Sequence, residues 1–318
     1  MSIDLTKFRI ALIVPCYNEA QTIRKVIMDF QATLPDIACC VFDNNSSDRT
    51  VEVARESGAK VWQVNLQGKG NVVRRMFADI DADIYVMVDG DATYDAAAAP
   101  QLIRTLIEGD LDMVVGSRVT DAVAAYRPGH RWGNRMLTGF VAMIFGRAFQ
   151  DMLSGYRVFS RRYVKSFPAH ARGFETETEL AIHALELRMP IAEVNTAYGA
   201  RPEGSISKLN TYRDGLRILL AIVKLFKIEK PLAFFSIGFV LCQLIALGLA
   251  IPIISTFLET GLVPRMPTAI LCSALVLLGF LSLTCGLVLD TVTLGRIEAK
   301  RFAYLSIPAA SHALQPKS

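Results

Sequence analysis

Two long stretches without any charged residue constrain this chain more than any other feature of its sequence. They cover residues 231–258 and 266–289 of the 318. A helix needs about 20 apolar residues to cross the hydrocarbon core of a bilayer, and both stretches are longer than that. Only a few residues separate them, so we predict a hairpin of two transmembrane helices. The alternative is a pair of helices buried in a soluble core, which fits the lengths and flanks less well.

Basic residues flank the predicted hairpin on both sides, which sets its orientation. Positively charged segments next to transmembrane helices stay in the cytoplasm. The flanking cations are Lys224, Lys227 and Lys230 before the hairpin and Arg296, Lys300 and Arg301 after it. We therefore expect a multi-pass protein of the cytoplasmic (inner) membrane, with both termini in the cytoplasm. Its parts would be a cytoplasmic domain (1–210), an amphipathic interface helix (211–230), two transmembrane helices (231–290) and a cytoplasmic tail (291–318).

The composition of the chain excludes several other classes of protein. Hydrophobic residues make up 52% and charged residues 20%, which excludes a disordered chain. The net charge of +4 is too small to indicate a nucleic-acid-binding protein by itself. The six cysteines show no CxxC pair and no zinc-type spacing, so we interpret them as reduced thiols of a cytoplasmic protein. An exposed hairpin would permit self-association, and a homo-oligomer stays an open alternative.

Before the apolar stretches, short strand-like runs alternate with helical ones. The run RIALIV at residues 9–14, for example, stops at Pro15 as a buried parallel strand would. The predicted strands cover residues 9–14, 37–42, 60–64, 84–88, 113–115 and 191–197. The predicted helices cover residues 19–33, 69–80 and 101–108, with one more that is capped at Ser46 or Ser47 and ends at Gly58. This alternation predicts an α/β domain with a Rossmann-like, mostly parallel sheet.

Polar residues follow the predicted strands at the edge where parallel sheets bind ligands. Asp89, Gly90 and Asp91 follow the fourth strand, and Asp43 follows the second. Two carboxylates spaced in this way can hold one hard divalent cation, Mg²⁺ or Mn²⁺, which also takes phosphate oxygens. A nucleotide bound through such a cation is therefore expected at this edge. For Asp43 alone, an Asx-turn that closes a tight loop is the alternative.

The Gly-Lys-Gly turn at residues 68–70 could suggest a dinucleotide-binding fold instead. That fingerprint needs a third glycine where this chain has Val73. The fingerprint also follows the first strand of its sheet, whereas this turn follows the third. A P-loop sequence is not present either. Both kinds of phosphate-binding loop are therefore excluded.

Eight motifs, in order along the chain, resemble those of the family 2 glycosyltransferases of GT-A fold. The last three narrow the resemblance to the branch of dolichyl-phosphate mannosyltransferases and bacterial polyprenyl-phosphate glycosyltransferases. The motifs are IVPCYNE (13–19), DNNSSDRT (43–50), GKG (68–70), VDGDATY (88–94), VVGSR (114–118), DMLSGYRVFSR (151–161), GFETETEL (173–180) and RPEGSISKL (201–209). Together they cover nearly all of residues 8–230. The C-terminal anchor of two helices also matches several bacterial members.

The resemblance implies a role for particular residues of this chain. Asp89 and Asp91 would hold the metal and the donor diphosphate, and Asp151 would lie beside the sugar or the acceptor. The residues implied for the nucleotide-sugar site are Pro15, Tyr17, Asn18, Glu19, Asp43, Lys69, Asp89 and Gly90. The cations implied for the acceptor phosphate are Arg118, Arg131, Arg201 and Lys208. The chain departs from the family at Asn44-Asn45 and at Thr93, which leaves the choice of donor open.

A lipid phosphate is an amphiphile, so the acceptor site must meet the membrane surface. Residues 132–149 and 212–228 combine apolar and basic side chains in the manner of helices that lie in the lipid interface. The alternative is that each segment packs its apolar face on the sheet. Residues 200–209 form a loop that could close over bound donor, with Gly204 giving it freedom. His183 lies in a predicted helix, and we expect it to be structural or on the surface rather than a base.

The resemblance implies an inverting transfer of a hexose, or a hexose derivative, to polyprenyl phosphate, with undecaprenyl phosphate as the expected lipid. The donor would be a UDP- or GDP-linked sugar, since Asp43 and Tyr17 do not separate the two bases. The acceptor is already an anion at neutral pH, so it needs positioning more than deprotonation. Two alternatives stay open: a processive polysaccharide synthase of the same fold, and a non-catalytic nucleotide-binding membrane scaffold.

Overall fold

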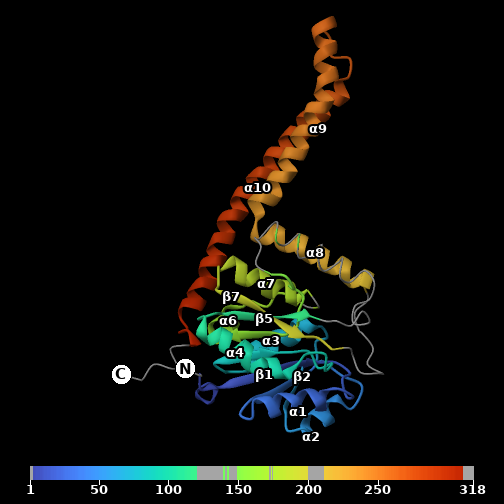
Figure 1. Ribbon diagram of the computed structural model, residues 1–318. Coiled ribbons are helices and arrows are strands. Elements are labelled where there is room, and N and C mark those ends of the chain that lie inside the picture. Colours follow the sequence, from blue (N-terminus) through green and yellow to red (C-terminus); the bar gives the residue numbers. More distant parts are fainter. Residues whose placement is uncertain are drawn as a thin grey trace. The chain divides into compact units, whose positions relative to one another are not determined.

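The computed structural model describes residues 3–119, 139, 142, 149–171, 173, 175–199 and 211–310 (Figure 1). The chain divides into two compact units. The first comprises Met1–Ala221 together with Lys300–Ser318, and the second comprises Ile222–Ala299. The first unit holds the sheet and its covering helices, and the second holds most of the two long C-terminal helices.

The first unit is built on a sheet of seven strands in the order β3-β2-β1-β4-β6-β5-β7. Six strands run parallel to one another, and β6 runs antiparallel to both of its neighbours. The strands are β1 (Ile10–Cys16), β2 (Ala38–Asp43), β3 (Lys60–Gln63), β4 (Ile84–Met87), β5 (Met113–Val119), β6 (Arg157–Ser160) and β7 (Ile191–Ala197). The predicted α/β domain with a mostly parallel sheet is therefore confirmed.

Helices connect the strands and cover both faces of the sheet (Figure 1). The described helices up to β7 are α1 (Ile23–Thr33), α2 (Thr50–Glu56), α3 (Lys69–Asp79), α4 (Ala99–Glu108), α6 (Arg161–Ser166) and α7 (Thr176–Glu186). Two short 3₁₀ turns, η1 (Leu5–Lys7) and η2 (Ala96–Ala98), lie in this unit as well. The helices α8 (Thr211–Glu229), α9 (Pro231–Thr260) and α10 (Met266–Leu305) follow.

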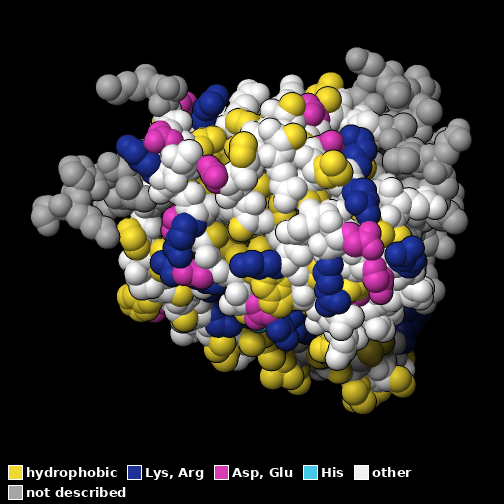
Figure 2. Space-filling model, turned by 90° about the horizontal axis from the view of Figure 1, so that it is seen from below, with side chains coloured by type: hydrophobic (Ala, Val, Ile, Leu, Met, Phe, Trp, Pro, Cys, Tyr) yellow, Lys and Arg dark blue, Asp and Glu magenta, His cyan; other side chains and the backbone are white. Residues whose placement is uncertain are grey.

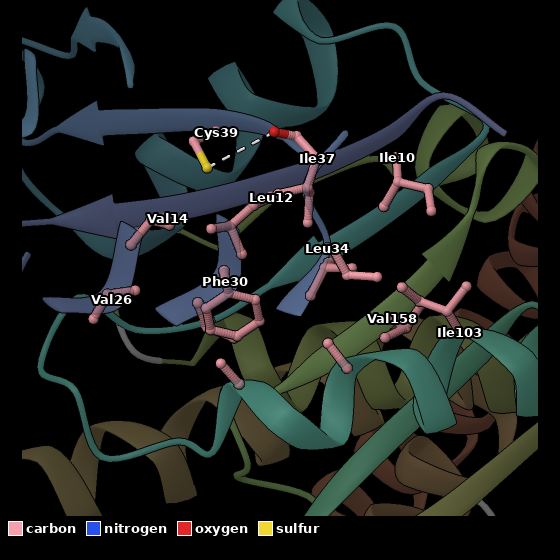
Figure 3. Close-up of a cluster of buried hydrophobic side chains, with 14 of the residues drawn as sticks. Ile10, Leu12, Val14, Val26, Phe30, Leu34, Ile37, Cys39, Ile103 and Val158 are labelled. Carbon is pink, nitrogen blue, oxygen red and sulfur yellow. Dashed lines mark hydrogen bonds between the residues drawn. The ribbon is translucent and has the colours of Figure 1, made fainter. Parts of the chain in front are cut away.

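Alternate strand residues face the two helical layers, because successive side chains of a strand point to opposite faces. On one face, Leu12 and Val14 of β1 belong to a buried cluster with Phe30 of α1 and Ile103 of α4 (Figure 3). Full burial of one such side chain stabilises the fold by about 1.5–3 kcal/mol. On the other face, Phe77 of α3 packs edge-on against aromatic rings of β4 and β6. Packing in the core thus fixes the positions of the strands, whose ends carry the polar loops.

Two local predictions differ from the structure. The strand β6 was not predicted, since RVFS is only four residues long and opens with an arginine. Arg157 is nevertheless fully buried, because its guanidinium donates to the backbone oxygens of Ser154 and Glu177 at 3.0 and 3.1 Å. The helix predicted to be capped at Ser46 or Ser47 begins instead at Thr50. The reason is that Asp48 accepts hydrogen bonds from the backbone and hydroxyl of Thr50, which keeps the preceding residues in a turn.

The end of α10 belongs to the first unit. The Lys300 ammonium lies 2.6 Å from the Glu186 carboxylate of α7, and the Tyr304 hydroxyl donates to the buried carboxylate of Asp112 at 2.9 Å. The sequence predicted a helix ending near residue 289, but the helix continues to Leu305. Charged residues after position 289 end the apolar stretch, but they do not end the helix.

The second unit is a pair of apolar helices in which small residues of α10 pack against a large residue of α9. Both helices are long and apolar enough to cross a membrane, and little of either apolar window is buried, 6% in α9 and 17% in α10. A Cβ atom added at Gly286 would lie 3.0 Å from the Cβ atom of Phe235. The hydroxyl of Ser282, one turn earlier, donates to the backbone oxygen of Phe235 at 2.9 Å. Close packing at small residues is typical of helix pairs in membranes.

The helix α8 leaves an apolar side uncovered by described residues. Leu216 and Leu220 are 58% and 59% exposed, and Val223 is exposed as well. The observed bounds of Thr211–Glu229 agree with the predicted range to within one residue at each end.

Charges of both signs are mixed on the surface. Figure 2 shows one face of the molecule, on which described basic and acidic side chains are interspersed. Exposed ion pairs such as Arg24–Glu56 and Arg9–Asp83, each at 2.8 Å, are of this mixed kind. Exposed pairs contribute at most about 1 kcal/mol each, so the buried core determines the stability of this unit.

Candidate functional site

The loops after β1, β2 and β4 are tied together at one edge of the sheet. The backbone N–H of Asn18 donates to the Ser46 hydroxyl at 2.9 Å, and that of Glu19 donates to the Thr50 hydroxyl at 2.8 Å. The Thr22 hydroxyl donates to the backbone oxygen of Gly90 at 2.6 Å. These bonds bring the predicted residues Asn18, Glu19 and Gly90 to one place.

Pro15 and Tyr17 belong to the same edge. Pro15 lies within β1, opposite Phe42 of β2, and the strand continues to Cys16 instead of stopping before the proline. The Tyr17 side chain, just beyond the strand, is 39% exposed. The ring thus lies at the carboxyl edge of the strands, where parallel sheets bind ligands.

The two carboxylate oxygens of Asp43 have different surroundings. Its Oδ2 atom accepts from the backbone N–H of Ser46 at 3.1 Å, which closes the turn after β2. Its Oδ1 atom is buried and has no hydrogen-bond partner among the described residues. A buried acceptor without a partner costs free energy, so it is a position where a ligand donor would be favourable.

Asn44 explains one of the departures from the family motifs. Its side-chain amide donates to the backbone oxygens of Val64 and Leu66 at 3.0 and 2.8 Å. Its side-chain oxygen accepts from the backbone N–H of Gly68 at 2.7 Å. A carboxylate could accept but not donate, so an aspartate at this position could not make the same bonds. Asn44 therefore fixes the loop between β3 and α3.

The Gly-Lys-Gly turn brings a lysine into the site. Gly68 has φ +124°, and a Cβ atom on Gly70 would collide with the backbone oxygen of Ala171, so both positions need glycine. The Lys69 ammonium lies 2.5 Å from Asp89 Oδ1 and 2.5 Å from Glu177 Oε1. Burial alone would lower the pKa of Lys69, but the two carboxylates raise it above its ordinary value. Lys69 is therefore held as a cation.

Glu177 is a site residue that the sequence reasoning did not single out. It lies in α7, and the only signal for it was its place in the motif GFETETEL. Its side chain is 7% exposed, and its Oε2 atom has no hydrogen-bond partner among the described residues.

The acid pair after β4 has the donor chemistry that a hard divalent cation needs. The Asp89 side chain is 31% exposed, whereas Asp91 is buried and accepts from the Thr93 hydroxyl at 2.6 Å. Among the described residues, no group of three or more His, Cys, Asp or Glu side chains could hold a metal. A cation held by Asp89 and Asp91 would take its remaining ligands from a diphosphate or water, as Mg²⁺ usually does.

Asp151 and Arg118 form one unit at the end of β5. The guanidinium donates to both carboxylate oxygens, with Nε–Oδ2 and Nη2–Oδ1 distances of 2.7 Å. Glu193 accepts from the backbone N–H groups of Gln150 and Asp151 at 2.9 and 3.2 Å, which orients Asp151. The Arg118 guanidinium also lies over the Tyr198 ring, 5.5 Å from its centroid. The structure thus places two predicted residues in one bidentate ion pair.

Three of the predicted cations lie outside the described residues. They are Arg131, Arg201 and Lys208. The loop 200–209 also lies outside them. So does the segment 132–149, except for residues 139, 142 and 149.

His183 is in the core of the first unit and not at the site. It lies in α7 between the rings of Tyr163 and Phe167, with its Nε2 atom 3.2 Å from the Ser166 hydroxyl. Burial lowers the pKa of His183 to about 3, and the Lys300 charge adds to this effect. The ring is therefore neutral at pH 7, which agrees with a structural role.

Known proteins resemble this chain in sequence. The family described as Glycosyl transferase family 2 matches residues 11–167. An uncharacterised protein of Shigella flexneri is 56% identical over 155 residues, which cover 49% of this chain and 95% of that protein. The glycosyltransferase AglJ of Haloferax volcanii is 34% identical over 304 residues, covering 93% of this chain and 98% of AglJ. A dolichyl-phosphate hexose transferase of the same organism is 29% identical over 215 residues, covering 68% and 92%.

Solved structures resemble the chain as well. One is glucosyl-3-phosphoglycerate synthase of Mycobacterium tuberculosis in complex with Mn²⁺, UDP-glucose and phosphoglyceric acid. It is 26% identical, with a TM-score of 0.56, and the match covers 68% of this chain and 80% of that one.

Proposed function

Since the chain belongs to glycosyl transferase family 2, we propose that it transfers a hexose, or a hexose derivative, from a nucleotide-sugar to polyprenyl phosphate. The observation that carries this proposal is that one chain combines this site with two exposed apolar helices. A lipid acceptor is reached at a membrane, whereas a soluble acceptor needs no anchor. The name of the dolichyl-phosphate hexose transferase supports the same class of acceptor.

The donor is proposed to be a UDP- or GDP-linked sugar. The structural relative binds UDP-glucose and Mn²⁺, which supports a nucleotide-sugar with a divalent metal. In this chain, Asp43 Oδ1 would accept a hydrogen bond from the nucleoside. Pro15, Tyr17, Asn18 and Glu19 would shape the pocket around it, and the Lys69 ammonium would meet the diphosphate.

The proposed chemistry needs positioning more than proton transfer. When bound, a cation held by Asp89 and Asp91 would offset the charge of the leaving nucleoside diphosphate. An oxygen of the polyprenyl phosphate, already an anion at neutral pH, forms the new bond to the anomeric carbon. The bond from that carbon to the diphosphate breaks on the opposite side, which inverts the anomeric configuration.

Arg118 is proposed to draw the acceptor phosphate into line. Asp151 orients the Arg118 guanidinium through the bidentate pair, and it need not act as a general base. Arg131, Arg201 and Lys208 are proposed as further cations for the same phosphate. A planar guanidinium suits phosphate oxygens because it offers two parallel donors.

We propose that α9 and α10 cross the cytoplasmic (inner) membrane, with both termini in the cytoplasm, and that α8 lies in its interface. The exposed Leu216 and Leu220 support the position of α8. A reporter fused after Ser318 is expected to read cytoplasmic, and one inserted at Gly261, between the two helices, is expected to read external. A cytoplasmic signal from the Gly261 insertion would contradict this topology.

A donor screen tests the proposed reaction. Purified full-length protein in detergent is incubated with undecaprenyl phosphate and a panel of radiolabelled UDP- and GDP-sugars. One donor is expected to give an organic-extractable product that mild acid cleaves. Label in a water-soluble polymer would instead favour a processive synthase. The absence of transfer from every donor would argue against the proposal.

A further inference from the structure

Lys69 bridges one acid of the proposed metal pair and a second, buried acid. We propose that Lys69 is a resident counter-ion for Asp89, so that a divalent cation binds tightly only together with a nucleoside diphosphate. This inference rests on the proposed function, because it concerns the same donor site. The inference adds an order of binding: the nucleotide promotes metal binding, and the bound metal in turn holds the nucleotide.

The position of Lys69 is fixed by its neighbours along the chain. Gly70 lies against the backbone oxygen of Ala171 with no room for a side chain, and Gly68 is tied to Asn44. The start of α3 therefore cannot shift easily. A displacement of the ammonium would therefore have to come from rotation of the Lys69 side chain.

The Lys69 ammonium contacts an Asp89 oxygen that a metal ion would need as a ligand. It lies 2.5 Å from Asp89 Oδ1, and its own side chain is only 11% exposed. A cation that arrives alone meets a carboxylate whose charge the ammonium already partly offsets. At short range and low exposure, one positive charge beside a binding site weakens cation binding strongly.

Glu177 offers the ammonium a second position. Its Oε1 atom already contacts Lys69 at 2.5 Å, and its buried Oε2 atom has no partner among the described residues. An ammonium group carries three N–H donors, and the described contacts with Asp89 and Glu177 use two of them. When the ammonium leaves Asp89, Glu177 Oε2 and a diphosphate oxygen can both accept from it.

Three variants test whether Lys69 acts as a counter-ion of Asp89. Lys69→Met keeps most of the length of the side chain and removes its charge, so Mn²⁺ without nucleotide is expected to bind about tenfold more tightly. Glu177→Gln leaves Lys69 with Asp89 as its one anionic partner among the described contacts, so Mn²⁺ alone is expected to bind several-fold more weakly. Lys25→Met is the matched control, because it makes the same charge change in an exposed pair with Asp29 and should leave Mn²⁺ affinity unchanged.

The readout is Mn²⁺ affinity by electron paramagnetic resonance, on full-length protein, alone and with UDP or GDP. In the wild type, one of these nucleotides is expected to tighten Mn²⁺ binding at least tenfold, and in Lys69→Met this gain is expected to shrink to a few-fold. If Lys69→Met does not fold, the double variant Lys69→Met/Glu177→Gln replaces it and should still bind Mn²⁺ alone more tightly than the wild type.

The proposal is overturned if removal of the Lys69 charge leaves Mn²⁺ affinity unchanged or weaker. It is also overturned if neither UDP nor GDP affects Mn²⁺ binding to the wild type. The assay contains no sugar and no lipid, so it does not depend on the acceptor. A failure of the sugar-transfer proposal would therefore appear in the donor screen and not here.

Discussion

Asn44 supports the site through three hydrogen bonds that only an amide can make together. It donates to the backbone oxygens of Val64 and Leu66 and accepts from the N–H of Gly68. The sequence showed this position as a departure from the family and not as a support. The bonds join residues about 20 positions apart, which is why a motif comparison could not reveal them.

We expect Asn44→Asp to destabilise the first unit by about 2 kcal/mol, since a carboxylate would face two carbonyl oxygens without a donor. Donor affinity should fall as well, because Gly68 precedes Lys69. The free energy of unfolding in denaturant is the measurement. Asn45→Asp is the control: Asn45 is exposed, with φ +65°, a conformation that aspartate also tolerates. Equal losses from both variants would argue against this role of Asn44.

The buried His183 predicts an acid-sensitive fold. Its folded pKa of about 3 lies below the ordinary 6.5, so the unfolded chain takes up a proton first as the pH falls. Stability is therefore fully present above about pH 6.5 and decreases below it, by up to about 2 kcal/mol between pH 6.5 and 5. In His183→Phe this component should be absent. The free energy of unfolding at both pH values checks it, and an unchanged slope in the variant would be evidence against it.

The residues of the site differ in how far the sequence could reveal them. Asp43, Asp89 and Asp91 follow predicted strands, and the parallel sheet brings such positions to one edge. Glu177 was out of reach, because its contact with Lys69 joins two helices that are far apart in the sequence. Ion pairs of this kind depend on the tertiary packing of α3 and α7, which no local pattern encodes.

At the scale of elements, the strands and helices that the sequence predicted well are those with strong apolar patterns. The strand β7 was predicted with its observed bounds, whereas β6 was missed because it is short and begins with Arg157. The start of α2 was misplaced because Asp48 forms a local turn with Thr50. Side-chain bonds to nearby backbone compete with helix starts, and their outcome depends on the neighbouring loops.

Packing of α9 against α10 gives a prediction at this scale. Gly286→Leu should weaken the hairpin by about 1–3 kcal/mol, because the new side chain would collide with Phe235 and Leu232. Thermal unfolding of the purified protein in detergent measures the effect. The matched control is Gly248→Leu in α9, where nothing lies within 4 Å of the added Cβ atom. If Gly248→Leu were as harmful as Gly286→Leu, close packing at Gly286 would not be the cause.

At the scale of the whole molecule, the sequence predicted a sheet domain followed by two apolar helices. In the structure, Lys300–Ser318 belongs to the same compact unit as Met1–Ala221. Contacts of Lys300 and Tyr304 account for this, and they involve buried partners that the sequence pattern does not mark. Composition could locate the two apolar stretches, but not the contacts of the segment after them.

We propose that this site transfers sugar to a polyprenyl phosphate. The most direct measurement is the mass spectrum of the lipid product formed by wild type and Asp91→Asn from the same nucleotide-sugar. The substituted amide would keep an oxygen that accepts from the Thr93 hydroxyl, so folding should be preserved. We expect the wild type to form hexosyl-phosphoryl-polyprenol, and Asp91→Asn to form at least about a hundredfold less, a loss of about 3 kcal/mol in transition-state stabilisation. Equal product from the variant, or no lipid-linked hexose from the wild type, would contradict the claim.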